Sequence, residues 1–220
     1  MHKTKILVIE PVTHDVKRIR LERPEGFDYQ VGDATELALD VDGWRDEKRP
    51  FTMTSLPEDP YLEFTIKEYP DHDGVTTRLH DMKPGETVLI DDPFKTFRNK
   101  GKGVFIAGGA GITPFLAILR KEREKHSLDG YTLIFANKRT EDIICRDELA
   151  GMPELKVVHV LSEDKEPGMH HGEVDADLIR GEVEDFDQRF YLCGPPPMME
   201  AVQKSLDKLG VKADAVDLSD

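Results

Sequence analysis

The feature that most constrains the fold is a change of sequence pattern near Gly103. Before it, short apolar or alternating stretches of strand length are separated by Gly, Pro and Asp residues. After it, apolar strands alternate with helical stretches, which is typical of a parallel sheet covered on both faces. A chain of 220 residues is long enough for two units with a core each. We therefore predict two domains, residues 1–98 and 103–220, with a linker at 98–103.

The first unit is predicted to be a six-stranded antiparallel β-barrel, because its strands are short and joined by turns. A short helix, expected over Thr76–Met82, would plug one end of this barrel, and a Lys-Pro-Gly turn follows it. The expected strands are Lys5–Ile9, Val16–Leu21, Ala34–Val41, Pro50–Thr54, Leu62–Lys67 and Thr87–Asp91.

The second unit is predicted to be an α/β domain with a parallel sheet, the architecture of many nucleotide-binding proteins. Its last helix should stop at Gly210, because glycine readily adopts the left-handed conformation that ends a helix. The expected strands are Val104–Ala107, Leu133–Ala136, Val157–Leu161 and Phe190–Cys193, and the expected helices are Pro114–His126, Arg146–Met152, Asp175–Arg180 and Pro197–Leu209.

Composition and charge exclude several classes of protein. The formal net charge is -14, so the phosphate backbone of a nucleic acid would be repelled. The N-terminus has no apolar stretch of signal-peptide length, and the longest uncharged run, Gly103–Leu119, is too short to span a membrane. We expect a cytoplasmic protein without a membrane span or a nucleic-acid partner.

No metal site is expected from the sequence. Cys145 and Cys193 are the two cysteines, and neither stands in the spacing of a zinc site or an iron–sulfur cluster. Both are predicted to be free thiols. The segment Met169–Gly172, with two adjacent histidines, is interpreted as a polar loop because no recognisable ligand spacing surrounds it.

The first informative motif is Arg49–Ser55 (RPFTMTS), which places a basic group, an aromatic ring and hydroxyls on one strand. Alternation along a strand would put Arg49, Phe51 and Met53 on the same face. Taken alone, an ordinary amphipathic barrel strand explains this motif. A second motif, Gly74–Thr77 (GVTT), begins the short helix, and its backbone N–H groups and hydroxyls could bind a phosphate there.

Two further motifs lie in the second unit. Gly108–Pro114 (GGAGITP) joins a strand to a helix, and its glycines permit a tight turn close to a ligand, with Thr113 as a possible helix cap and Pro114 in the first turn. Cys193–Met199 (CGPPPMM) follows the last strand, at the edge of the sheet where ligands of open parallel sheets bind. A buried filler cysteine is the alternative interpretation of Cys193.

These motifs, in this order over nearly the whole chain, resemble the ferredoxin–NADP reductase superfamily, which includes cytochrome b5 reductases and flavin reductases. The resemblance implies non-covalent FAD in the barrel, with FMN less expected, and NADH or NADPH as co-substrate. It implies that Arg49 binds the flavin diphosphate, that Phe51 packs on the flavin, and that Thr52 and Cys193 orient the reacting atoms. The full set of implied cofactor-binding residues is Arg49, Pro50, Phe51, Thr52, Ser55, Ile66, Lys67, Tyr69, Gly74, Val75, Thr76, Thr77, Gly109, Gly111, Thr113, Pro114, Asn137, Lys138, Cys193, Gly194, Pro195 and Met198.

The identity of the nicotinamide donor is predicted from charges after the second and third strands of the α/β domain. Lys138 and Arg139 could contact the 2′-phosphate of NADPH, but Glu163 and Glu173 fall where NADPH-dependent relatives carry arginines. Carboxylates there would repel that phosphate. We therefore favour NADH.

The resemblance implies a separate electron acceptor, such as a ferredoxin, a flavodoxin or a cytochrome. The basic residues Lys95, Arg98, Lys100 and Lys102 near the linker are candidates for docking an acidic acceptor. Two alternatives stay open at this stage. The protein could reduce free flavin as a substrate, or it could be a non-catalytic electron-transfer subunit of a larger complex. The chain also ends in VDLSD, without the C-terminal aromatic residue that covers the flavin in plant-type reductases.

Overall fold

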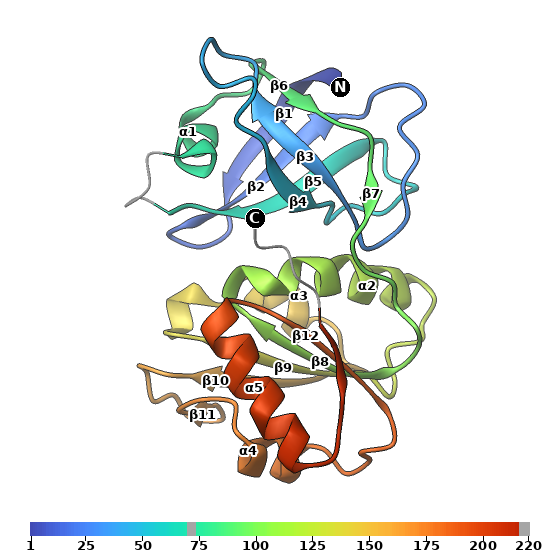
Figure 1. Cartoon of the computed structure of the whole chain (residues 1–220), viewed down its shortest axis with the longest axis vertical. Coiled ribbons are helices and arrows are strands. Elements are labelled where there is room, and N and C mark those ends of the chain that lie inside the picture. Colours follow the sequence, from blue (N-terminus) through green and yellow to red (C-terminus); the bar gives the residue numbers. More distant parts are fainter. Residues whose placement is uncertain (70–73, 216–220) are drawn as a thin grey trace.

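The computed structural model describes residues 1–69 and 74–215, which form two layered units stacked along the long axis of the molecule (Figure 1). The VDLSD terminus lies outside the described residues. None of the helices within the described residues is long and apolar enough to cross a membrane.

The first unit is the predicted antiparallel barrel. Its strands follow the order β4-β3-β6-β1-β2-β5, and β7 also pairs with β3. Helix α1 packs Val75 and Leu79 into the barrel core, as expected for a plug. The elements are β1 (His2–Pro11), β2 (Val16–Glu22), β3 (Asp33–Leu39), β4 (Arg49–Thr52), β5 (Tyr61–Lys67), α1 (Val75–Asp81), β6 (Thr87–Ile90) and β7 (Phe94–Lys95).

The second unit is a parallel sheet of order β11-β10-β9-β8-β12-β13. Its strands are β8 (Gly103–Gly108), β9 (Thr132–Asn137), β10 (Lys156–Leu161), β11 (His170–His171), β12 (Arg189–Cys193) and β13 (Ala213–Ala215). Its helices are η1 (Gly109–Ile112), α2 (Thr113–Glu124), η2 (Thr140–Asp142), α3 (Arg146–Ala150), α4 (Ala176–Glu182) and α5 (Pro196–Lys208). The predicted division at residues 98–103 falls between the two sheets.

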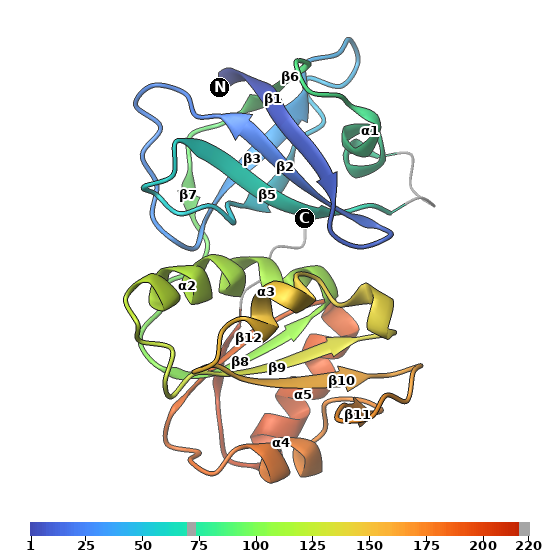
Figure 2. The same cartoon turned by 180° about the vertical axis from the view of Figure 1, so that it is seen from behind.

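Helices cover both faces of this sheet, but only one of these faces is turned toward the barrel. Helices α2 and α3 lie on the side facing the barrel, and α4 and α5 lie on the other side (Figures 1 and 2). The core on the barrel side includes Phe115 of α2 and Leu149 of α3, together with Val16 of the barrel and Phe97 of the connecting segment. The two units therefore share one apolar core at their junction.

The predicted elements differ from the observed ones mainly at short strands and helix ends. Strands β7, β11 and β13 were not predicted; each is only two or three residues long, so no periodic pattern can reveal it. The prediction that Thr113 caps α2 was wrong, because the N-cap is Ile112 and Thr113 is already helical. Gly210 directly follows Leu209, the C-cap of α5, and has a φ of 74°, which confirms the predicted helix stop.

Candidate functional site

A cleft of about 790 Å³ lies between the two units. The barrel contributes residues from the β1–β2 turn and from the end of β5, and the α/β unit contributes the carboxyl ends of its strands. This is the edge at which open parallel sheets bind ligands. Of the residues predicted from the sequence, those that line the cleft are Lys67, Tyr69, Gly109, Asn137, Lys138, Pro195 and Met198.

The glycine-rich turn is held against the CGPPPMM segment by close backbone packing. Gly109 has φ of 50° and no atom within 4 Å of the position a Cβ would take, so the backbone is open to the cleft there. A side chain on Gly111 would collide with the carbonyl of Cys193, and Gly194 packs on the backbone of Gly108. The two predicted ligand-binding turns therefore form one surface, with Thr113 and Pro114 buried behind it.

Asn137 is the last residue of strand β9, and its side-chain amide lacks hydrogen bonds within the described structure. Its amide nitrogen and its amide oxygen are both buried, and neither has a hydrogen-bond partner among the described residues. A buried unpaired amide is costly unless a ligand or water satisfies it. Nearby, the buried hydroxyl of Thr140 also has no protein partner in the described part of the chain.

Strand β4 carries a similar group in the barrel. The hydroxyl of Thr52 is buried and has no hydrogen-bond partner in the described structure. Phe51 and Met53 pack against the barrel core, whereas Arg49 is exposed. The Arg49 guanidinium donates to the carbonyl of Lys48 at 2.6 Å, so it lies at the surface beside the half-buried Pro50.

The residues around helix α1 are positioned in part by their own contacts. The hydroxyl of Thr77 donates to the carbonyl of Tyr69 at 3.2 Å. Gly74 is the extended N-cap, Thr76 is half-buried, and Val75 is buried in the barrel core. The helix start is therefore tied to the end of β5, whose Tyr69 side chain is 49% exposed at the cleft.

The predicted residues Ile66 and Ser55 are among those that do not line the cleft. Ile66 is 2% exposed and belongs to the barrel core, so only its backbone could meet a ligand. The Ser55 hydroxyl is paired with the Tyr29 hydroxyl at 2.8 Å and accepts from the Glu63 N–H at 2.9 Å. The structure does not bring the Ser55 side chain to the cleft.

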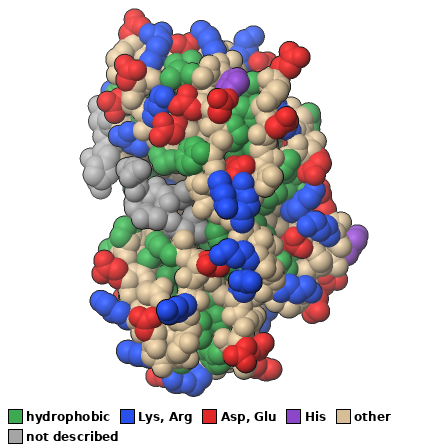
Figure 3. All heavy atoms as spheres, turned by 45° about the vertical axis from the view of Figure 1, so that its right-hand side comes forward, with side chains coloured by type: hydrophobic (Ala, Val, Ile, Leu, Met, Phe, Trp, Pro, Cys, Tyr) green, Lys and Arg blue, Asp and Glu red, His purple; other side chains and the backbone are tan. Residues whose placement is uncertain are grey.

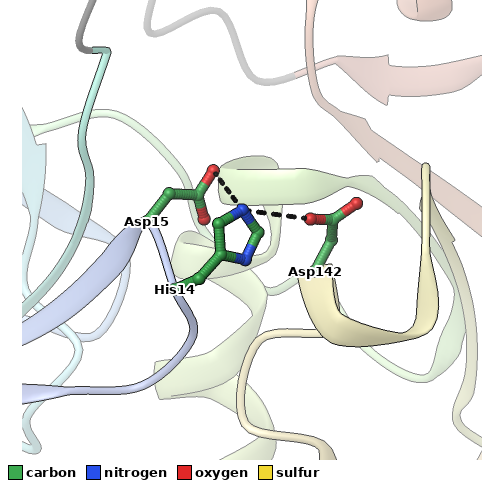
Figure 4. A group of neighbouring side chains, drawn as sticks. All are labelled: His14, Asp15 and Asp142. Atoms are coloured by element: carbon green, nitrogen blue, oxygen red, sulfur yellow. Dashed lines mark ion pairs between the residues drawn. The ribbon is translucent and has the colours of Figure 1, made fainter.

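A partly exposed cluster of His14, Asp15 and Asp142 joins the two units at the rim of the cleft (Figure 4). The Nε2 atom of His14, in the β1–β2 turn, lies 3.7 Å from a carboxylate oxygen of Asp15 and 3.7 Å from one of Asp142 in η2. Their spacing could hold a metal ion. However, Asp15 is already paired with Lys67 at 2.6 Å, and Asp142 accepts the Arg139 N–H at 2.8 Å. Protein groups therefore already engage both carboxylates.

A second cluster, the Arg120 network, crosses the same junction around the buried carboxylate of Glu63. Arg120 of α2 donates to the Thr54 carbonyl at 2.7 Å and to the Glu63 carboxylate at 2.6 Å, both in the barrel. It also makes a two-point contact with Glu148 of α3, at 2.6 and 2.8 Å. Arg20 approaches Glu63 at 3.0 Å.

The charges of the Arg120 network stabilise one another. Burial alone would favour neutral Glu63, but the guanidinium groups of Arg120, Arg20 and Arg18 hold the pKa of this carboxyl below its ordinary value. The pKa of Arg120 is raised despite burial, because Glu148 and Glu63 favour its charged form. The sequence does not point to Arg120 or Glu63, because neither stands in a recognisable motif.

The chain has many relatives among known proteins. Residues 105–204 match the oxidoreductase NAD-binding domain family. Over 97% of its length, the chain is 28% identical to the reductase component of propane 2-monooxygenase from Rhodococcus jostii, and it spans 62% of that protein. Over 94% of its length, it is 30% identical to NADH-cytochrome b5 reductase 2 from Mycosarcoma maydis, and it spans 69% of that protein.

Solved structures share the fold of this chain. A ferredoxin NADP+ reductase from Neisseria gonorrhoeae with bound FAD and NADP has a TM-score of 0.82 at 21% identity, with 97% of this chain and 98% of that one covered. The CS-b5R domains of human Ncb5or in the NAD+ form have a TM-score of 0.85 at 26% identity, with 98% of this chain and 69% of that one covered. The chain therefore belongs to the ferredoxin–NADP reductase superfamily, the NAD(P)H-dependent flavin oxidoreductases that include the cytochrome b5 reductases.

Proposed function

We propose that the protein oxidises NADH, passes the hydride to FAD bound in the barrel, and delivers electrons to a separate acceptor protein. The observation that carries this proposal is the interdomain cleft. It joins Lys67 and Tyr69 of the barrel to the glycine-rich turn and the CGPPPMM segment of the α/β unit. A cofactor held by one unit and a co-substrate held by the other would meet there.

The buried polar groups fit such a pair of ligands. The unpaired hydroxyl of Thr52 can hydrogen-bond a polar flavin atom, and the unpaired amide of Asn137 can donate to and accept from a dinucleotide. The open backbone at Gly109 leaves room for a diphosphate against the start of η1 and α2. Bound FAD supplies a two-electron acceptor for the hydride of NADH and can release electrons singly to a protein.

The chain's own residues would supply orientation rather than acid–base chemistry. Arg49 and the Gly74–Thr77 backbone would hold the flavin diphosphate, and Phe51 and Tyr69 would flank the flavin. Cys193 would meet the nicotinamide from the turn that packs on Gly111. Thr52 would orient the accepting atom.

The preference for NADH is supported by an ion pair at the cleft. Arg139, a candidate for binding the 2′-phosphate of NADPH, donates from Nε to Glu163 at 2.8 Å. Its charge is therefore engaged by a carboxylate of the same cleft, and Glu173 adds a further negative charge there. A 2′-phosphate would have to displace or approach these carboxylates.

The acceptor is proposed to be a protein with its own redox centre. Relatives of this chain are named as the reductase component of a propane monooxygenase and as cytochrome b5 reductases. The basic cluster near the linker is weaker than the sequence suggested, because Arg98 pairs with Asp33 and Lys100 pairs with Asp214. Figure 3 shows acidic and basic side chains interspersed over one face of the molecule, so charge alone would not select the partner.

The test is an anaerobic titration of the FAD-loaded protein with NADH and, separately, with NADPH, followed by the visible flavin spectrum. Stoichiometric bleaching by NADH at lower concentration than by NADPH is the expected result. A protein that retains no FAD but reduces added free flavin would instead be a flavin reductase. A protein that retains FAD and responds to neither nucleotide would contradict the proposal and favour a subunit of a larger complex.

A further inference from the structure

The Arg120 network links the two halves of the proposed reaction centre through a short rigid path. Helix α2 begins at Thr113, directly after the glycine-rich turn of η1, and Arg120 lies about 10 Å further along the same helix at 1.5 Å per residue. At its other end, Arg120 holds the carbonyl of Thr54. Thr54 is two residues after Thr52, so one side chain connects the dinucleotide turn to the flavin strand.

The barrel end of this path is itself fixed. The Thr54 N–H donates to the Glu63 carbonyl at 2.7 Å, and its hydroxyl lies 3.2 Å from the Glu63 carboxylate. The Met53 N–H donates to the Asp33 carbonyl at 3.2 Å. The segment after Thr52 therefore has little freedom to move independently of Glu63 and Arg120.

The other end is fixed within the α/β unit. The two-point contact with Glu148 of α3 sets the orientation of the Arg120 guanidinium, as planar arginine–carboxylate pairs do. The Glu63 side chain is 3% exposed, whereas that of Glu148 is 23% exposed. Solvent screening is therefore weakest on the Glu63 side of the contact.

We propose that Arg120 is a positioning residue for hydride transfer: by bridging Thr54 and Glu63 of the barrel to Glu148 of the α/β unit, it sets the distance between the flavin and the nicotinamide. The inference rests on the proposed function. Arg120 touches neither ligand; it acts through the strand that carries Thr52 and the helix that carries the glycine-rich turn. Hydride transfer depends steeply on this distance, since a misplacement of about 1 Å can cost on the order of 100-fold in rate.

The test compares Arg120→Met with Lys121→Met. Lys121 is the next residue on α2 and also crosses the junction, pairing with the exposed Glu58 at 2.7 Å, so it is a matched control for loss of an interdomain ion pair. We expect Arg120→Met to slow NADH-dependent flavin reduction by about 10- to 100-fold in stopped-flow measurements. FAD content and NADH binding should stay near wild type, and Lys121→Met should reduce its flavin at the wild-type rate.

Two readouts separate positioning from a general loss of structure. The long-wavelength charge-transfer band of the reduced protein with NAD⁺, which reports stacking of the two rings, should weaken in Arg120→Met and persist in Lys121→Met. Small-angle scattering of the flavin-free proteins should show a larger radius of gyration for Arg120→Met alone. If Arg120→Met does not fold, Arg120→Lys serves instead, because a lysine keeps the charge but cannot bridge all three partners.

The outcomes distinguish this inference from the function on which it rests. Wild-type flavin that is not reduced by NADH contradicts the proposed function. If wild type is reduced by NADH, two results would overturn the positioning role and leave the proposed function intact. One is an unchanged reduction rate and charge-transfer band in the Arg120 variants, and the other is an equal loss of rate and band in Lys121→Met. A slower rate that is restored by adding excess FAD would also overturn it, because the defect would then be cofactor retention.

Discussion

The Arg120 network and the proposed ligand motifs both contain buried polar side chains, yet their hydrogen bonding differs. In the network, Arg120 has protein partners on both units, and Glu63 is 3% exposed between arginines. At the ligand motifs, the Thr52 hydroxyl and the Asn137 amide are buried without partners in the described structure. Buried groups with hydrogen-bond partners stabilise the fold, whereas a buried group without one can be satisfied by a ligand or a water molecule.

The largest expected effect follows from breaking the network at Glu63. Glu63→Ala leaves Arg120 and Arg20 without their shared carboxylate, which should lower the free energy of unfolding by about 3–5 kcal/mol. Denaturant unfolding monitored by fluorescence measures it. The matched control is Glu58→Ala, which removes the exposed partner of Lys121 and should cost no more than about 1 kcal/mol. Equal losses in the two variants would show that burial does not distinguish the two contacts.

The same carboxylate gives the network a pH dependence. Because the folded-state pKa of Glu63 is below its ordinary value of 4.5, its stabilising contribution is complete above that value and is lost as the pH falls through the folded-state pKa. Between about pH 5 and 3, wild type should therefore lose more stability than Glu63→Ala does. Thermal melting curves at matched ionic strength measure the difference, and parallel curves would contradict the assignment.

The next effect concerns an unsatisfied group. Thr52→Val removes a hydroxyl that has no protein partner, so the free energy of unfolding of the flavin-free protein should change by less than about 1 kcal/mol. Flavin reduction by NADH should nevertheless slow by roughly tenfold or more, if the hydroxyl orients the accepting atom. Stopped-flow absorbance and denaturant unfolding together measure the two quantities.

A matched threonine in the adjacent strand provides the control for Thr52. The buried hydroxyl of Thr35 donates to the Asp91 carbonyl at 2.7 Å. Thr35→Val should therefore destabilise the protein, by about 1–2 kcal/mol, and leave the reduction rate unchanged. The opposite pattern, with Thr52→Val destabilised and fully active, would remove the basis for reading unpaired groups as ligand contacts.

A smaller effect is expected at the Arg139–Glu163 pair on the cleft surface. Glu163→Gln releases Arg139 and removes a negative charge, so the ratio of kcat/KM for NADPH to that for NADH should rise by roughly two- to fivefold, the range of an exposed ion pair. Asp177→Asn, which breaks the exposed pair with Arg180 at 2.7 Å in α4, should leave the ratio unchanged. An unchanged ratio in Glu163→Gln would argue against the proposed basis of NADH preference.

Local patterns in the sequence predicted most of the fold but not the network. The predicted strand Leu62–Lys67 forms β5, in which Leu62, Phe64 and Ile66 face the barrel core. Alternation along the strand turns Glu63 outward. In an isolated barrel, an outward glutamate faces water. Here the second unit covers that face, and Glu63 becomes a buried ion-pair partner. That covering is a contact between distant segments, which no local pattern reports.

The candidate site was predictable to the extent that it uses compact motifs. The resemblance implies that Gly109, Asn137, Pro195 and Met198 are ligand contacts, and all four line the cleft. Ser55 shares a motif with Thr52, yet its hydroxyl is bonded inside the barrel to Tyr29. Resemblance transfers a motif as a block, whereas the direction of each side chain depends on neighbours from other strands.

The smallest expected effect on stability is at the rim of the cleft, where the solvent-exposed His14 side chain lies between the two units. His14 is 53% exposed and lies 3.7 Å from both carboxylates, and Asp15 keeps its contact with Lys67 when the imidazole is removed. His14→Ala should therefore change the free energy of unfolding by less than about 1 kcal/mol. Added Mg²⁺ or Zn²⁺ should leave the difference in melting temperature between this variant and wild type unchanged. A loss of unfolding free energy close to that of Glu63→Ala would show that burial does not distinguish the two interdomain contacts. A rise in melting temperature with Mg²⁺ or Zn²⁺ in wild type, but not in His14→Ala, would show that this cluster binds a cation.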